Sequence, residues 1–456
     1  MQYKSGETMS NFDTRAVHAG RADLRELGVH APPLDMSTTY PVGDLDGAAD
    51  QLDAWAAGEQ PAGSPVYARL HNPTVARFEE AMAELEGAAA AVAFASGMGA
   101  ITAILLALAP DRRHVVAVRP LYGGTDHLLC GDLLAIDVTW AEPHEVREAL
   151  RPNTGLIVLE TPQNPTSTLV DIAAVARQAG DVPVLVDNTF ATPVLQQPIT
   201  LGASLVVHSA TKFIGGHGDV MGGVVACDEA FAKRLRYVRI ATGAVLHPMA
   251  AYQLHRGLAT LPIRVRAMQR TATELAARIA AHRAVGVVYH ASLAATDPDR
   301  LVGRQMSGPG SMIAFELNGG FAAARTLLGS LNLMTHAVSL GSTDTLIQHP
   351  ASLTHRVVDA GCRDESGVNQ SLVRISVGLE HVDDLWADLV QALDAIDVID
   401  GIDAIHPIDA TTDDAVDAVV AMAVAQELVM PMHSTRDAVT SVARAAGRPR
   451  RSATAR

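Results

Sequence analysis

The residues with the clearest chemical potential lie in the stretch 204–219, SLVVHSATKFIGGHGD. The apolar run LVV predicts a buried strand, and Lys212 follows the strand after a few polar residues. The chain contains only three lysines, Lys4, Lys212 and Lys233. Burial at a strand end disfavours the ammonium form and lowers the pKa of a lysine, which makes the amine a nucleophile. The pattern indicates a lysine that forms a Schiff base with a carbonyl cofactor, and a strand-end lysine that reaches solvent is the alternative.

Asp187 is a second candidate, because it ends the apolar run VLVDNTF. A carboxylate in this place could simply cap the next helix. Lys212 follows 25 residues later, at the end of what we expect to be a neighbouring strand. Paired with such a lysine, Asp187 could keep a pyridine nitrogen protonated, so that the ring withdraws electrons.

A phosphate site is predicted where FASGMGAI passes from a strand into a helix, because the N–H groups of Gly97 and Met98 open that helix. Ser209 and Thr211 could add hydroxyl donors, with ordinary strand-end capping as the alternative. The segment GMGAIT lacks the third glycine of a dinucleotide fingerprint and an acidic partner at the expected distance. NAD binding is therefore not expected.

Two further side chains suggest ligand contacts. Tyr122, in PLYGGTDH, is either a loop anchor or a ring that stacks on a planar cofactor. Arg374 lies inside the apolar run LVRISVGL, where burial requires an anion, either an internal Asp or Glu or the carboxylate of a substrate. His208 and His217 have no spacing typical of a zinc site, and we expect no metal.

The elements that must position these residues alternate between short apolar runs and helical segments from residue 88 to about 260. This alternation predicts an α/β fold with a mostly parallel sheet covered by helices on both sides. The carboxyl ends of parallel strands meet at one edge, where ligands bind. Before this region, Asn72 and Pro73 predict the start of a helix that ends at Gly87. The expected strands are AVAFASG, HVVAVRP, LIVLETP, VPVLVDNTF, SLVVHSATK and GGVVAC.

The chain is expected to divide into four parts: an N-terminal arm that contacts a neighbouring subunit (1–70), a large cofactor-binding domain (71–260), a smaller C-terminal α/β domain (261–400), and a helical extension with a disordered basic tail (401–456). The smaller domain is predicted to contain a helix at about 263–284, a strand at 312–317, a helix at 321–331, a strand at 372–379 and a helix after 381.

The overall composition excludes several classes of function. A formal net charge of −15 argues against nucleic acid and against an anionic membrane as partners. Three cysteines are typical of a reducing compartment, and no apolar stretch is long enough to cross a membrane. We therefore expect a soluble cytoplasmic protein.

At these motifs the chain resembles the pyridoxal phosphate enzymes of cysteine and methionine metabolism, the transsulfuration or γ-family of fold type I. The resemblance covers roughly residues 12–400. It is carried by YARLHNPT, FASGMGAI, LYGGT, ETPQNPT, VDNTFATP, HSATKFIGGHGD, SLGSTDTLIQHPASLTH and LVRISVGLE. The resemblance implies a large, mostly parallel seven-stranded sheet and a smaller C-terminal domain.

The resemblance also implies roles for individual residues. Lys212 would bind the cofactor covalently and move protons, Asp187 would pair with the pyridine nitrogen, and Tyr122 would stack on the ring and act as an acid or base. The remaining roles are phosphate binding by Gly97, Met98, Ser209 and Thr211, phosphate binding in a neighbouring subunit by Tyr67 and Arg69, and substrate orientation by Asn164, Ser339 and Arg374. A shared site makes a dimer the smallest active unit, and the family habit is a homotetramer built from such dimers.

Two apolar residues bear on the substrate. Relatives that handle cystathionine carry an acidic residue at the position of Val66, and the lyases among them also carry a glutamate at that of Val338. An apolar wall would leave a distal ammonium unpaired, so an uncharged γ-substituent is favoured. The motifs resemble methionine γ-lyases most, except at Gly124, where those enzymes usually have a cysteine, and at Arg239-Ile240, where they usually have Lys-Asp.

The leading hypothesis is γ-elimination on a methionine- or homoserine-type amino acid, which gives a 2-oxo acid, ammonia and a thiol. The alternative is γ-replacement, as in O-acyl-homoserine sulfhydrylases or cystathionine γ-synthases, and the same residues would serve both reactions. A third, remote hypothesis is a non-catalytic protein that has kept the fold.

Overall fold

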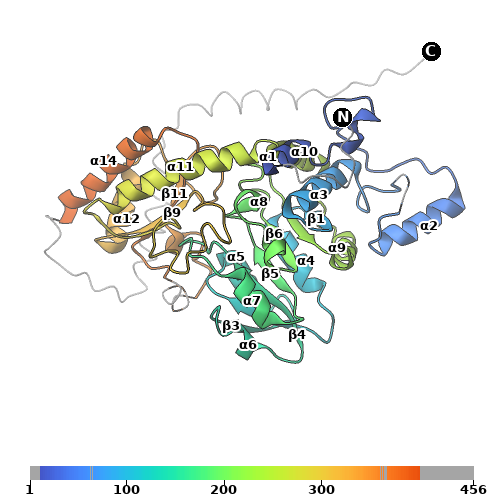
Figure 1. Cartoon of the computed structure of the whole chain (residues 1–456), viewed down its shortest axis with the longest axis horizontal. Helices are drawn as coiled ribbons and strands as arrows, with labels where there is room; N and C mark the ends of the chain where they lie inside the picture. The colour runs from blue at the N-terminus through green and yellow to red at the C-terminus, as the bar shows by residue number, and fades with distance from the viewer. Residues whose placement is uncertain are drawn as a thin grey trace, which may run out of the picture. The chain divides into compact units, whose positions relative to one another are not determined.

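A seven-stranded sheet forms the centre of the computed structural model, which describes residues 11–61, 63, 65–359, 361, 363 and 367–400 (Figure 1). Its strand order is β1-β7-β6-β5-β4-β2-β3, and only β7 runs antiparallel to its neighbours. The carboxyl ends of the other six strands therefore meet at one edge. The strands are β1 (Ala90–Phe94), β2 (His114–Val118), β3 (Asp137–Ala141), β4 (Thr154–Glu160), β5 (Val184–Asp187), β6 (Leu205–His208) and β7 (Gly223–Cys227).

All six predicted strands of this sheet are present, and β3 was not predicted. Strands β1, β2, β4 and β7 are buried along their whole length, which explains why their sequences are continuously apolar. In contrast, β3 lies at the sheet edge and is only partly buried, so its sequence DVTWA lacks that signal.

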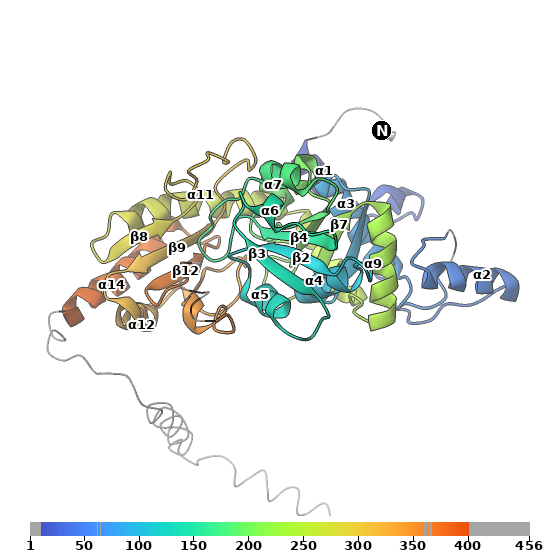
Figure 2. The same cartoon turned by 90° about the horizontal axis from the view of Figure 1, so that it is seen from below.

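Helices cover both faces of the sheet (Figure 2). One face packs against α3 (Pro73–Glu86) and α7 (Ile172–Ala179), and the other against α4 (Gly97–Leu106), α5 (Gly123–Cys130) and α9 (Glu229–Thr242). The shorter or peripheral helices are α1 (Phe12–His18), η1 (Ala22–Arg25), α2 (Leu45–Ala56), α6 (Val146–Ala149), α8 (Thr192–Leu195), η2 (Pro198–Leu201) and α10 (Pro248–Leu258).

Helix α3 begins and ends as its sequence predicts. The Asn72 side chain accepts hydrogen bonds from the N–H groups of Thr74 and Val75, and Pro73 is the first helical residue. Gly87 ends the helix with a φ of 70°, a left-handed conformation that suits glycine. The apolar face of α3 is buried against the sheet.

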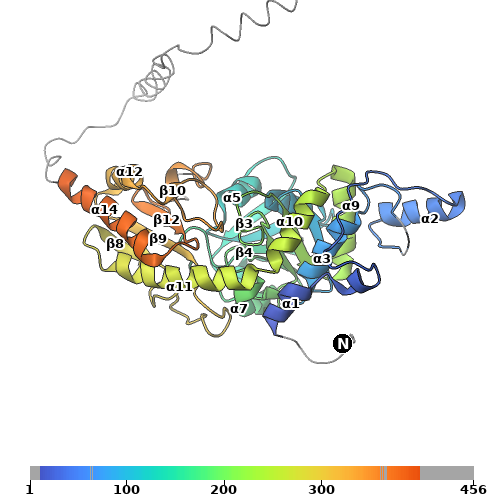
Figure 3. The ribbon, with the colours of Figure 1, turned by 90° about the horizontal axis from the view of Figure 1, so that it is seen from above.

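A second sheet follows in the C-terminal part, with the order β10-β11-β12-β9-β8. It is antiparallel apart from the β10–β11 pair at its edge. Its elements are β8 (Val285–Tyr289), β9 (Met312–Leu317), α12 (Gly320–Ser330), β10 (Thr335–His336), β11 (Leu346–Gln348), η3 (Pro350–Ser352), β12 (Leu372–Ser376) and α14 (Val382–Asp400). The long helix α11 (Leu261–Ala280) runs from beside α1 and α10 to α14 and β8 (Figure 3).

The predicted bounds in this part need small corrections. The strand expected over 372–379 ends at Ser376, because Val377 and Gly378 donate their N–H groups to Ser311 and Thr345 instead of continuing the ladder. The helix expected at about 263–284 ends at Ala280, since β8 begins at Val285.

Both sheets belong to one compact unit, Met1–Gly401, so the boundaries predicted after residues 70 and 260 stay predictions. The extension predicted over 401–456 lies outside the described residues. Among the helices that the structure describes, none is both long and apolar enough to cross a lipid bilayer.

Candidate active site

Lys212 lies in the turn that follows β6, at the carboxyl edge of the large sheet. Its backbone N–H donates to the Ser209 carbonyl at 3.0 Å. Its amine Nζ donates to Ser339 Oγ at 2.6 Å. Burial lowers the pKa of Lys212 to about 8, and the positive charge of Arg374 adds to the effect. A useful share of the amine is therefore neutral near physiological pH, as a nucleophile or a base requires.

The turn that carries Lys212 is held by Arg264 of α11. The guanidinium donates to the carbonyls of Phe213 at 2.6 Å, Gly257 at 2.8 Å and Ile214 at 3.3 Å. These acceptors are neutral, and burial lowers the pKa of Arg264 to about 10. A buried arginine bound to three carbonyls makes the turn rigid at the cost of desolvating its charge.

Ser339, in the C-terminal part of the chain, contacts the same turn through its hydrogen bond with Lys212. Its φ of 89° is unusual for a residue other than glycine and costs roughly 1–3 kcal/mol of strain. Arg374 Nη2 holds the Ser339 carbonyl at 2.8 Å, and Ser376 Oγ accepts from the Gly341 N–H at 2.8 Å. The strain is maintained because both ends of this short segment are fixed to β12.

Asp187 ends β5 at the floor of the site. Its carboxylate accepts from the Thr189 N–H at 3.0 Å, and Thr189 Oγ1 accepts from the Ser209 N–H at 2.9 Å. Burial raises the pKa of Asp187, although the hydrogen bond with Thr189 opposes the shift. Within the described ranges, no ion pair includes Asp187. A cationic N–H group placed beside it would favour the carboxylate form.

The phosphate site predicted from the sequence is a compact cradle. Ser96 caps α4 by accepting from the Gly99 N–H at 3.0 Å. Gly97 lies so close to Ser209 that an added Cβ would be 2.9 Å from the Ser209 Cβ. The Thr211 hydroxyl is already hydrogen-bonded to the backbone of Gly222, at 3.0 and 3.2 Å. The start of α4 and Ser209 thus form one surface suited to an anion.

Tyr122 stands before α5, with its side chain 39% exposed. A Cβ added to Gly124 would be 2.7 Å from Tyr122 Cε1 and 3.2 Å from Met98 Sδ. The ring, Met98 and Gly124 are therefore in immediate contact. The Tyr122 N–H donates to Glu160 Oε2 at 2.7 Å.

Arg374 is 2% exposed and is surrounded by neutral oxygens. Its Nη1 donates to Asn164 Oδ1 at 2.7 Å and its Nη2 to the Ser339 carbonyl at 2.8 Å. The Gln348 amide oxygen accepts from Nη2 at 2.7 Å. Burial lowers the pKa of Arg374 to about 10. No carboxylate of the described residues forms an ion pair with Arg374, although the charge of Glu160 raises the pKa of the guanidinium and so opposes the effect of burial.

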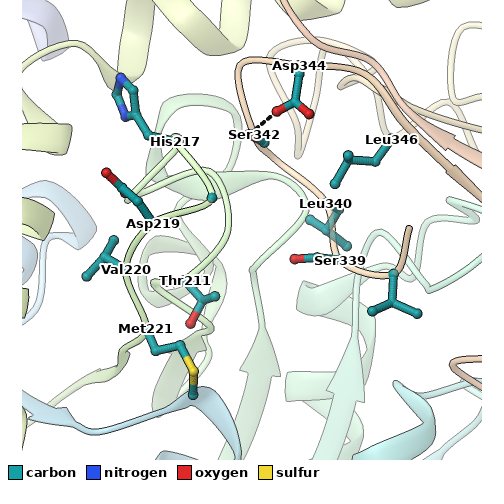
Figure 4. A pocket seen from close by; sticks show the side chains of 12 residues that line it. Thr211, His217, Asp219, Val220, Met221, Ser339, Leu340, Ser342, Asp344 and Leu346 are labelled. Atoms are coloured by element: carbon teal, nitrogen blue, oxygen red, sulfur yellow. Dashed lines mark hydrogen bonds between the residues drawn. The ribbon is translucent and has the colours of Figure 1, made fainter. Parts of the chain in front are cut away.

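A cavity of about 500 Å³ lies between the loop 217–221 and the segment 338–346 (Figure 4), and Ser339, the hydrogen-bond partner of the Lys212 amine, is one of its lining residues. Thr211 and Ser339 line it, together with Val338, which is 51% exposed. Asp344 also lines it and accepts a hydrogen bond from the Ser342 hydroxyl.

Three residues predicted to belong to the site, Val66, Tyr67 and Arg69, lie away from the Lys212 turn in this subunit. Arg69 donates to the Ile240 carbonyl at 2.8 Å, and its guanidinium is 5.7 Å from the centre of the Tyr67 ring. Tyr67 is 43% exposed, and Val66 lines a separate cavity near the N-terminal arm. Among the described residues, no hydrogen bond joins Tyr67 or Arg69 to the Lys212 turn.

Sequence reasoning missed three residues of the site: Glu160, Thr189 and Gln348. Glu160 ends β4 as Asp187 ends β5, so the strand-end rule that selected Asp187 could have selected Glu160. Thr189 follows Asp187 by two residues. Gln348 could be found only from the strand register, which pairs it with Arg374 across β11 and β12.

The residues present fit pyridoxal phosphate. Among the described residues the buried carboxylate of Asp187 forms no ion pair, the N-terminus of α4 faces Ser209, and the Lys212 amine is held by Ser339 at the same edge of the sheet. Fold and site together define an α/β enzyme that uses this cofactor on an amino acid.

Comparison with known proteins leads to the same class of enzyme. The family model described as "Cys/Met metabolism PLP-dependent enzyme" matches residues 13–394, and the chain belongs to this family. It is therefore a pyridoxal phosphate-dependent enzyme of fold type I, and the fold predicted from the sequence is confirmed.

The chain is 57% identical over 386 residues to an L-methionine gamma-lyase of Brevibacterium aurantiacum, which covers 84% of this chain and 94% of the relative. It is 56% identical over 393 residues to an L-methionine gamma-lyase of Streptomyces avermitilis, covering 86% and 91%. A crystal structure of cystathionine gamma synthase from Xanthomonas oryzae pv. oryzae, in complex with aminoacrylate and cysteine, is 34% identical with a TM-score of 0.79. It covers 86% of this chain and 100% of that one.

Proposed function

We propose that the protein catalyses γ-elimination on methionine or a similar amino acid with an uncharged γ-substituent, releasing a 2-oxo acid, ammonia and a thiol. The observation that carries the proposal is one continuous contact path, from Asn164 through Arg374 and Ser339 to the Lys212 amine. This path supports a role for Arg374 in binding a carboxylate, with Lys212 as the base at its other end and the apolar Val338 next to Ser339 in the cavity. The relatives named L-methionine gamma-lyase support the same reaction.

Pyridoxal phosphate, when bound, supplies a ring that stabilises negative charge next to the α-carbon of the amino acid. Asp187 would pair with the ring nitrogen, and the N-terminus of α4 with Ser209 would hold the phosphate. Thr211 would join them by turning its hydroxyl from the Gly222 carbonyl. Arg374 would orient the substrate carboxylate, with Asn164 fixing the guanidinium. Lys212, oriented by Ser339, would accept the α-proton and later the β-proton. Tyr122 would stack on the ring and donate a proton to the leaving sulfur, and water would release the 2-oxo acid and ammonia.

Val338 favours an uncharged γ-substituent because it offers no partner to a distal ammonium. Leaving such a charge without a partner at that wall costs roughly 1–3 kcal/mol or more. The carboxylates that line the same cavity are Asp219 and Asp344, and Asp344 already accepts from the Ser342 hydroxyl. A thioether needs no ionic partner. Methionine is therefore preferred over cystathionine.

The test is a product screen with the purified holoenzyme. Methionine is expected to yield 2-oxobutyrate and methanethiol in equal amounts, and cystathionine to react more slowly. Homocysteine, O-acyl-homoserines with and without sulfide, and S-adenosylmethionine complete the screen. Turnover of an O-acyl-homoserine with sulfide, without any product from methionine, would contradict γ-elimination.

Turnover of an O-acyl-homoserine with sulfide, and none of methionine, would instead establish γ-replacement, the other candidate function. It is favoured by the likeness to cystathionine gamma synthase at a TM-score of 0.79. The ratio of replacement product to 2-oxo acid, measured at rising thiol concentration, separates the two reactions.

The site is proposed to be completed by a second copy of the chain, in a dimer that pairs into a homotetramer. Tyr67 and Arg69 would reach the phosphate site of the neighbouring subunit. Supporting this, Tyr67 is exposed, and the N-terminal arm exposes several large apolar side chains: Leu27, Val29, Leu34, Met36, Val42 and Leu45. Sedimentation of the holoenzyme tests the assembly. We also propose a cytoplasmic location, since three cysteines, a small and odd number, are typical of a reducing compartment.

A further inference from the structure

Glu160 is a buried carboxyl group inside the candidate site that the chemistry above does not use. It ends β4, and the register of the sheet pairs it with Asp187 at the end of β5. Paired residues of neighbouring strands point to the same face, so the two carboxyl groups lie side by side. Glu160 is only 5% exposed.

The contacts of Glu160 join two loops of the site. Its Oε2 accepts from the Tyr122 N–H at 2.7 Å. The backbone N–H of Asn164, four residues further along the chain, lies near enough to lower the pKa of the carboxyl group slightly, and the Asn164 side chain accepts from Arg374 at 2.7 Å. One carboxyl group therefore touches the loop with the aromatic ring and the loop that fixes the arginine.

The Tyr122 loop has a second fixed point at its next residue. A Cβ added to Gly123 would lie 2.2 Å from the Thr354 carbonyl oxygen, so the backbone of the loop is in direct contact with that of Thr354. Two consecutive residues of the loop are therefore held, Tyr122 by the hydrogen bond with Glu160 and Gly123 by the backbone of Thr354. A shorter acceptor at position 160 would draw the backbone of Tyr122 away from its place or lose the hydrogen bond.

The state of the carboxyl group fits a hydrogen-bonding role. Burial and the negative charge of Asp187 raise the pKa of Glu160 well above its ordinary value. Two adjacent buried carboxyl groups do not both ionise readily. In either protonation state an oxygen of Glu160 accepts from the Tyr122 N–H.

We infer that Glu160 is a positioning residue, which sets the place of the Tyr122 ring over the cofactor and, through Asn164, the orientation of Arg374. The inference rests on the proposed function in so far as Tyr122 stacks on bound pyridoxal phosphate. A purely structural role would affect stability alone. A positioning role also changes the environment of the cofactor and the KM for the amino acid.

Two variants of the holoenzyme separate the effect of the length of the side chain at position 160 from the effect of its acidic group. Glu160→Gln keeps the length and the acceptor oxygen without the acid, whereas Glu160→Asp keeps the acid and is one methylene shorter. Glu160→Gln is expected to retain the visible circular dichroism of the bound cofactor and its dissociation constant within about twofold. Glu160→Asp is expected to lose most of that dichroism, to weaken cofactor binding about tenfold and to raise KM about tenfold, as for a buried N–H left without its acceptor.

Glu79→Gln is the matched control, because Glu79 is another buried glutamate that accepts a backbone N–H, that of Ala93, at 2.7 Å. It lies outside the site and is expected to lower the melting temperature without altering the dichroism. The inference is overturned if Glu160→Asp matches the wild type, or if Glu160→Gln loses the signal as Glu160→Asp does. A wild-type enzyme that binds cofactor but does not act on methionine would refute the proposed function, and the dichroism of the variants would still decide this inference.

Discussion

Arg239 and Arg374 are both buried arginines, and their surroundings differ in one decisive respect. Arg239 forms an ion pair with Glu79 at 2.5 Å and donates to the Ala93 carbonyl at 3.0 Å. Arg374 contacts only neutral oxygens, from Asn164, Ser339 and Gln348. The first charge is balanced within the chain and stabilises the fold, whereas the second is balanced only when a carboxylate ligand binds.

The buried carboxylates show the same contrast. Glu86 and His208 form a pair at 2.5 Å on one face of the sheet, and both are almost fully buried. Asp187, at the end of the neighbouring strand, has a backbone N–H as its hydrogen-bond donor and no ion pair among the residues described. The ion pair of Arg239 with Glu79 therefore serves the fold, whereas Arg374 and Asp187 have neutral partners in the candidate site. Arg264 also has neutral partners, and it serves the site by holding the turn of Lys212.

Lys212→Ala is expected to have the largest effect on activity. If stability fell together with activity, the contrast between paired structural charges and the charges of the site would be contradicted. Turnover should drop by at least about 10³-fold, because the variant lacks both the group that binds the cofactor and the base. The melting temperature should stay equal or rise, since the amine has Ser339 as a neutral partner. Activity assays and thermal unfolding of the same preparation check both points. A large loss of stability would place Lys212 among the structural charges.

Arg374→Ala is expected to raise the KM for the amino acid about 10²-fold, the scale of a lost charge-assisted bidentate contact. Cofactor content, measured by absorbance, should not change. Arg374→Lys keeps the charge but not the planar fork, so it should recover only part of the affinity.

Arg239→Ala is the matched control for that prediction. It leaves buried Glu79 without its cationic partner and should destabilise the protein by about 3–5 kcal/mol. The KM of the folded fraction should equal that of the wild type. If Arg239→Ala raised KM as much as Arg374→Ala, the distinction between paired and unpaired charges would be wrong.

Local sequence patterns were sufficient to predict much of the fold and part of the site. The six apolar runs all form strands, and Asp187 and Lys212 were found because each follows such a run. The contact between Lys212 and Ser339 joins residues 127 positions apart and depends on how the C-terminal part packs. Gln348 depends on the register of β11 and β12 in the same way. Contacts of this kind arise from tertiary packing and leave no local periodicity in the sequence.

The pH dependence of cofactor binding tests the low pKa of Lys212. Protein freed of its cofactor should take up pyridoxal phosphate faster as pH rises, by about tenfold per unit below pH 8, because only the neutral amine reacts. The rate should level off above the pKa of about 8 rather than near the ordinary value of 10.5. Arg374→Gln removes a neighbouring positive charge and should raise the pKa, which moves the plateau to higher pH. A shift to lower pH would contradict the assigned cause.

Gly124→Ala is expected to have the smallest effect and to separate the position of the Tyr122 ring from the stability of the fold. The added Cβ would meet Tyr122 Cε1 at 2.7 Å, so the ring must move, and kcat/KM should fall about fivefold. Gly329→Ala in α12 is the control, because nothing lies within 4 Å of its added Cβ. Both substitutions replace a helical glycine, and the control should gain up to about 1 kcal/mol in stability at unchanged kcat/KM. An unchanged kcat/KM in Gly124→Ala would show that the reaction tolerates a displaced Tyr122 ring. Tyr122 would then not belong to the groups whose exact position the reaction requires.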